Sequence, residues 1–82
     1  MPSTRTIVID GDLDPLPVVF EMRGPTITVQ PGERLRLVVS GPEDAELTIG
    51  VGRNGISVFR GQALNVDVYG PDGTRVEMDG FA

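Results

Sequence analysis

The sequence contains no cysteine, no histidine, no lysine and no tryptophan. Without cysteine there is neither a disulfide nor a thiolate metal site. Without histidine and cysteine the chain lacks the usual nucleophile–base pairs of hydrolases, and without lysine it lacks the Ser–Lys alternative. The missing residue types therefore exclude the commonest catalytic arrangements.

Carboxylate pairs are the remaining candidates for acid–base catalysis. Glu43 with Glu46, and Glu77 with Asp79, lie near predicted turns or on the outward faces of predicted strands. Charged side chains in such places are solvated and keep the surface soluble. We therefore predict that the protein is not an enzyme and has no catalytic residues.

Long apolar runs are also absent. No segment approaches the roughly 20 apolar residues that a bilayer-spanning helix needs. Residues 1–5 lack the apolar region of a signal peptide. We expect no signal peptide and no membrane partner, and we expect the protein in a virion or in the cytoplasm of the producing cell.

Positive charge is scarce. Seven arginines face 12 acidic residues, which gives a net charge of −5. Binding to phosphate backbones needs a clustered excess of basic side chains. We therefore expect no nucleic-acid partner.

The sequence is rich in alternating apolar and polar residues, most clearly in residues 25–40. Ile27 and Val29 alternate with polar residues, and so do Leu35, Leu37 and Val39. Because side chains two residues apart on a strand share a face, each half of this segment is a strand with one apolar side. The Pro-Gly-Glu sequence between the halves favours a tight turn. The segment therefore predicts an antiparallel corner.

Six further alternating segments surround this corner, separated by turns rich in glycine and proline. They span residues 6–10, 17–23, 45–51, 56–60, 63–69 and 74–78. No apolar pattern of helical period lasts two turns without an interrupting glycine or proline. We predict an all-β fold, an antiparallel two-sheet sandwich of seven or eight short strands, Ig-like or jelly-roll. A small, partly open barrel is the alternative.

The length of 82 residues predicts a single domain, 1–82, with a polar N-terminal arm at 1–4 and a C-terminal tail at 79–82. The free energy gained by burying its apolar side chains is opposed by backbone entropy of similar size, and no disulfide adds to it. We therefore expect stabilisation by neighbours, as a homo-oligomer or within an assembly.

The glycines of residues 50–55 match the letters of the dinucleotide-binding fingerprint. That chemistry needs the last glycine to open a helix whose amides bind the pyrophosphate. Here Gly55 is followed by Ile-Ser-Val-Phe, which is typical of a strand. Asn54 with Gly55 is instead a signal for a hairpin turn, so we predict a hairpin and no cofactor.

Asp10, Asp12 and Asp14 alternate, with Glu21 at the position of the bidentate ligand of an EF-hand. The sixth position of that calcium loop must be a sharply turning glycine, and here it is Pro15. We predict a solvated acidic turn and no metal. A looser calcium site at this loop is the alternative.

Several apolar and aromatic residues fall on outward faces or outside the alternation: Val19, Val38, Phe59, Tyr69 and Phe81. Some of them would simply cap the edge of the core. Arginine and aromatic residues are, however, the types enriched at interface anchors. We predict that six residues contact a neighbouring protein: Arg5, Arg23, Arg53, Phe59, Tyr69 and Phe81.

The segment of residues 26–39 resembles the strand–Pro-Gly–strand corner of cupredoxins and of many bacterial Ig-like modules. The resemblance covers under a fifth of the chain and implies a sandwich. Cupredoxins hold copper through histidine and cysteine. Because this chain has neither, the resemblance carries no copper site.

The short, acidic, all-β chain is also similar in style to the decoration proteins of phage capsids. That similarity implies a non-enzymatic structural protein that docks on and reinforces a protein lattice, such as the major capsid protein of a virion. The alternative is an accessory β-sandwich module that binds a ligand or a peptide strand.

Overall fold

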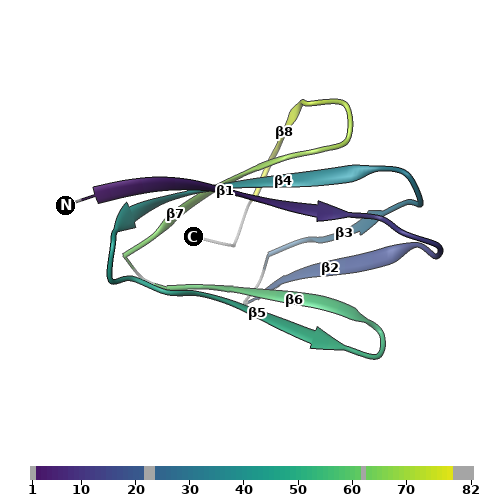
Figure 1. Ribbon diagram of the computed structural model, residues 1–82, viewed down its shortest axis with the longest axis horizontal. Coiled ribbons are helices and arrows are strands. Elements are labelled where there is room, and N and C mark those ends of the chain that lie inside the picture. The colour runs from purple at the N-terminus through teal and green to yellow at the C-terminus, as the bar shows by residue number, and fades with distance from the viewer. Residues whose placement is uncertain (1, 22–23, 62, 79–82) are drawn as a thin grey trace.

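The computed structural model describes residues 2–21, 24–61 and 63–78 and confirms an all-β sandwich of two four-stranded sheets, which lie one above the other in Figure 1. Sheet A has the order β1-β4-β7-β8, and sheet B has the order β3-β2-β6-β5. All strand pairs are antiparallel except β2 with β6, which is parallel. The strands are β1 (Pro2–Asp10), β2 (Leu16–Glu21), β3 (Thr26–Val29), β4 (Arg34–Pro42), β5 (Leu47–Gly52), β6 (Gly55–Arg60), β7 (Asn65–Tyr69) and β8 (Arg75–Val76).

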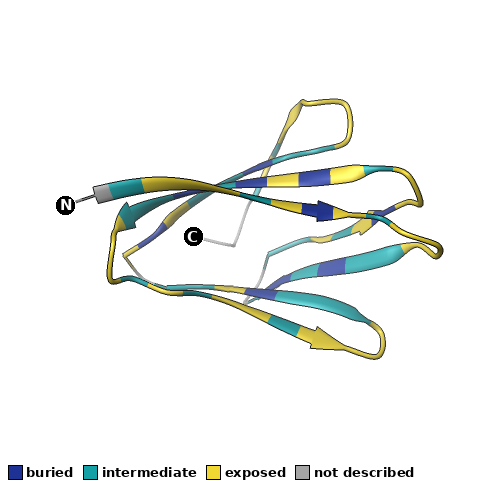
Figure 2. Ribbon diagram, viewed as in Figure 1, coloured by how far each residue is buried: buried dark blue, intermediate teal, exposed yellow. Residues whose placement is uncertain are grey.

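The core forms between the sheets from alternate residues of the strands. On β4, Leu35, Leu37 and Val39 are buried, as their alternation predicts, and the residues between them face outward. Figure 2 shows that buried positions occur on strands of both sheets. The core consists of Ile9, Val18, Phe20, Val29, Leu35, Leu37, Val39, Val58, Leu64 and Val68.

The predicted corner of residues 25–40 is confirmed as β3, a turn and β4. Gly32 has a φ of 83°, which a side chain would disfavour, and the amide of Glu33 donates to the carbonyl oxygen of Gln30 at 2.9 Å. The turn does not join neighbours in one sheet. It carries the chain from sheet B to sheet A.

The N-terminal segment differs from the predicted arm. Strand β1 begins at Pro2, so residues 2–4 pair with residues 40–42 of β4. Residues 41 and 42, predicted as a break, accordingly belong to β4. These residues form strands because β1 and β4 supply each other with hydrogen-bonding partners. The local sequence cannot reveal such a pairing between distant segments. Residues 79–82, the predicted tail, lie outside the described residues.

The strand order also differs from that of an Ig constant domain. In that fold the first strand pairs with the second. Here β1 pairs with β4, because β2 forms a hairpin with β3 in the opposite sheet. The two separate sheets also differ from the single curved sheet of the partly open barrel that was the alternative. None of the described segments forms a helix with the length and apolarity that a membrane span requires.

Candidate functional site

The outer face of sheet B carries almost no charge. The strand register places Val19 of β2 beside Ser57 of β6, and Ser57 beside Gly50 of β5. Their neighbours in sequence, Val18 and Val58, are buried in the core, so this row points away from it. The described residues of the four strands on this face are Pro17, Val19, Glu21, Thr26, Thr28, Thr48, Gly50, Gly52, Gly55, Ser57 and Phe59, of which only Glu21 is charged.

Phe59 lies in an open groove of this face. The groove has a volume of about 430 Å³. Val19 and Phe59 line its sides, and the small residues Gly50 and Ser57 leave room between them. Phe59 is 42% exposed although it is the largest side chain of the row. An aromatic ring half in water beside small residues is a ready contact for a partner.

The β5–β6 hairpin closes one end of the groove. The predicted hairpin is confirmed, but its two loop residues are Arg53 and Asn54, because Gly52 pairs with Gly55. Gly55 is required by its close approach to the backbone of β2 and not by the turn. It has a φ of 138°, and a Cβ there would lie 2.3 Å from the carbonyl oxygen of Pro17. The loop places Arg53 in the lining of the groove.

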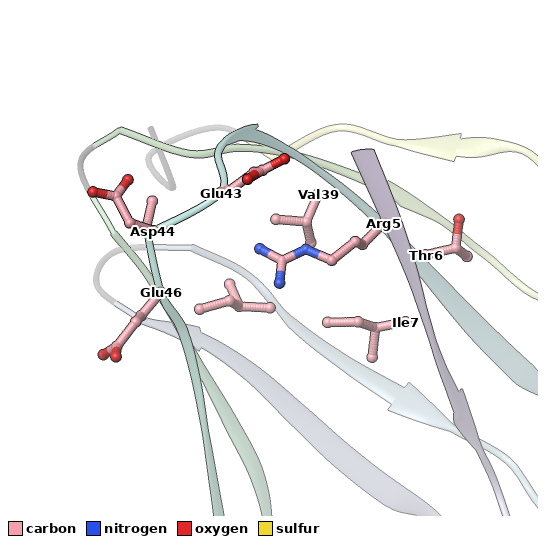
Figure 3. Close-up of a pocket in the computed structure, with 9 residues that line it drawn as sticks. Arg5, Thr6, Ile7, Val39, Glu43, Asp44 and Glu46 are labelled. Carbon is pink, nitrogen blue, oxygen red and sulfur yellow. The ribbon is translucent and has the colours of Figure 1, made fainter. Parts of the chain in front are cut away.

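A second hollow opens between β1 and the start of β5. This cavity has a volume of about 900 Å³ and is lined by one arginine, three carboxylates and apolar residues of both sheets. Arg5 shares the inward face of β1 with Ile7 and Ile9. Figure 3 shows the Arg5 side chain reaching over Ile7 and Val39 into the cavity, whereas Glu46 points away from it. Among the described residues, Arg5 forms no ion pair with these carboxylates.

The outer face of sheet A is charged. Arg34 donates to Asp10 at 2.8 Å, and Arg75 donates to Asp67 at 3.0 Å. Tyr69 lies on this face, opposite Arg36 on β4 and Arg75 on β8.

The six predicted contact residues are thus divided among different surfaces. Arg53 and Phe59 meet at the groove of sheet B, Arg5 enters the cavity, and Tyr69 lies on sheet A. Arg23 and Phe81 lie outside the described residues. Val19 and Val38, the other outward-facing valines, are half-buried.

The acidic loop does not bring its carboxylates together. Asp10 pairs with Arg34 instead. Within the described ranges, no three acidic side chains gather closely enough to hold a metal ion. The structure therefore offers no support for the calcium alternative.

The sequence pattern did not predict that Ile49 and Val51 are exposed to solvent. They share a face with Leu47, as predicted, yet Ile49 is 38% and Val51 82% exposed. Their face is the inner one, because they lie opposite Val58 and Ile56. They are exposed because β5 is an edge strand, and the alternation of its sequence gives no sign of this.

Comparisons with family models, with curated proteins and with solved structures find no match to this chain.

Proposed function

We propose that this protein is a non-enzymatic docking module that binds and reinforces a protein lattice, in the manner of a capsid decoration protein. The observation that carries the proposal is the half-exposed Phe59 in the groove of the outer face of sheet B, where Glu21 is the one charged strand residue described. Covering this face removes apolar surface from water and buries few charges. Both features favour a protein partner.

The groove suggests the chemistry of the partner. Phe59 and Val19 would receive an apolar side chain, with Gly50 and Ser57 leaving room for it. Arg53 at the end of the groove would meet a carboxylate. A surface loop of a lattice subunit, with an apolar residue beside an acidic one, meets both requirements.

Reinforcement follows from mass action. A ligand that binds only the assembled state stabilises that state by an amount that grows with its concentration. The proposed module would therefore raise the temperature at which the lattice dissociates and would leave the isolated subunits unaffected.

Cosedimentation with purified shells from the source tests this function. The wild-type protein should sediment with the shells and saturate. Phe59→Ser should weaken binding at least about tenfold, which is the effect of removing a central aromatic anchor. Tyr69→Ser is the matched control, because Tyr69 is an aromatic residue on the outer face of sheet A, and it should bind like wild type. Failure of wild type to sediment with any shell, or wild-type binding by Phe59→Ser, would refute the proposal.

The cavity between β1 and β5 favours the alternative function, a module that binds a ligand or peptide. Arg5 enters the cavity, whose lining also includes the acidic residues Glu43 and Asp44. Such a site suits a peptide with both an acidic and a basic side chain. Saturable binding in a peptide-array screen, lost in Arg5→Ala and retained in Phe59→Ser, would favour this alternative.

A further inference from the structure

The sandwich has four edge strands: β1 and β8 in sheet A, and β3 and β5 in sheet B. An edge strand presents a row of unpaired N–H and C=O groups, which can pair with a strand of another molecule. Proteins block such pairing with short edges, proline, charged residues on the strand, or a charge that points inward. The four edges of this sandwich differ in whether they carry these features.

Three of the edges are protected. Strand β1 begins with Pro2 and has the charged, inward-facing Arg5 in its middle. Strand β3 has only four residues and lies between Pro25 and Pro31. Strand β8 has only two residues.

Strand β5 has none of these features. It is six residues long, Leu-Thr-Ile-Gly-Val-Gly, without a charged residue or a proline. Within residues 2–21, 24–61 and 63–78, its only strand neighbour is β6. Ile49 and Val51 are exposed on its inner face. This edge is therefore both open and apolar.

We propose that β5 pairs with β5 of a second copy of this chain, antiparallel about a two-fold axis with Ile49 opposite Ile49. The pairing joins the two copies of sheet B into one continuous sheet. It uses the edge of β5 and not the outer face that carries Phe59. Arg53 takes part in both proposals, so Ile49→Lys and Phe59→Ser are the variants that separate them.

The side chains of β5 are complementary to themselves in this register. Leu47 of one copy lies opposite Val51 of the other, and the two Ile49 side chains lie opposite each other. A two-fold axis perpendicular to the sheet keeps the inner faces of both copies on the same side. The exposed apolar side chains of each copy then cover those of the other, and opposed apolar pairs stabilise antiparallel sheets.

The charged residues on either side of β5 favour pairing with a second copy in antiparallel orientation. Two copies each with a charge of −5 repel, but no charged residue of β5 enters the seam. Acidic residues, Asp44 and Glu46, precede the strand, and Arg53 follows it. Antiparallel pairing centred on Ile49 brings the Arg53 end of β5 in one copy to the Asp44–Glu46 end of β5 in the other. A parallel copy would instead place carboxylate beside carboxylate and arginine beside arginine.

Disulfide trapping tests the register. Because the chain has no cysteine, Ile49→Cys introduces a single thiol. Directly opposed residues have Cβ atoms about 4.5–5.5 Å apart, within reach of a disulfide after slight adjustment. Mild oxidation should convert most of the Ile49→Cys protein to a covalent dimer. Val8→Cys, at an exposed valine of the edge strand β1, is the control and should remain mainly monomeric.

Sedimentation equilibrium between about 1 μM and 1 mM tests the affinity. Wild type should be a dimer at the upper concentrations. Ile49→Lys should raise the dimer dissociation constant at least about tenfold, because two ammonium groups would face each other. Val8→Lys should dimerise like wild type. Far-UV circular dichroism checks that both variants are folded.

A charge swap keeps the test decisive if Ile49→Lys fails to fold. Arg53→Glu should weaken the dimer severalfold, and adding Glu46→Arg should restore it. A wild-type protein that stays monomeric up to 1 mM, or a dimer unaffected by both Ile49→Lys and Arg53→Glu, overturns the proposal. So does a monomer whose β5 binds a foreign strand peptide. Cosedimentation with shells is measured separately, so the two proposals fail independently.

Discussion

The outer faces of the two sheets have different chemistry although both cover the same core. The face of sheet A carries three arginines and two aspartates, and two ion pairs link them across neighbouring strands. The face of sheet B carries threonine, serine, glycine, valine and Phe59, with Glu21 as the one charged residue described. Both faces follow the same alternation of residues, so the difference lies in which residues occupy the outward positions.

The difference indicates which face a partner can cover at low cost. Burying the paired charges of sheet A would remove their hydration, and the ion-pair attraction only partly offsets that loss. Covering sheet B removes apolar surface and small hydroxyl groups from water, and few charged groups lose their hydration. Sheet A therefore suits contact with solvent, and sheet B suits contact with protein.

The largest expected effect compares the two aromatic rings of sheet B. Phe20 is buried and Phe59 is half-exposed on the adjacent strand. Phe20→Ala should lower the free energy of unfolding by about 3–5 kcal/mol, because it leaves a cavity in the core. Phe59→Ala should lower it by less than about 1 kcal/mol.

Urea unfolding at one fixed protein concentration measures both changes, since self-association would otherwise shift the midpoint. Phe20→Leu, with a smaller loss of volume, provides a measurable variant if Phe20→Ala does not fold. If Phe59→Ala lowers the free energy of unfolding as much as Phe20→Ala does, Phe59 is part of the packing that stabilises the fold. The outer face of sheet B is then not free to bind a partner.

The ion pairs of sheet A should contribute little. A double-mutant cycle with Asp67→Asn and Arg75→Gln should give a coupling free energy of about 0.2–1 kcal/mol, because both side chains are largely exposed. The coupling should fall further in 1 M salt. A coupling well above this range, or one independent of salt, would mean that this face is more rigid and less solvated than its exposure indicates.

The smallest expected effect is the dependence of stability on pH through Asp72. The amide of Thr74 donates to Asp72 in the β7–β8 turn at 2.9 Å and lowers the pKa of this carboxyl below its ordinary value. A lowered folded-state pKa adds stability above about pH 4, and this stability is lost as the pH falls through the folded pKa.

Asp72→Asn should therefore lose stability at neutral pH and become equal to wild type in strong acid. Thermal melts between about pH 2 and 7 measure this difference. A difference that is constant across this range would show that the turn depends on the shape of Asp72 and not on its charge.

The sequence predicted the strands and the inward residues because both depend on local alternation. The faces of β2 and β4 follow directly, and so does the turn at Gly32. The prediction of exposed residues was less successful. Phe59 was identified, whereas Ile49 and Val51 were not, because the same alternation describes a strand inside a sheet and one at its edge.

The sequence by itself determined an all-β fold of short strands, since side-chain alternation and turn residues act over a few neighbouring positions. Only the tertiary structure decided which strands meet, because pairing depends on hydrogen bonds between segments far apart in the chain. It therefore also decided that β1 pairs with β4, that Arg53 and Phe59 share a groove, and that β5 is left at an open edge.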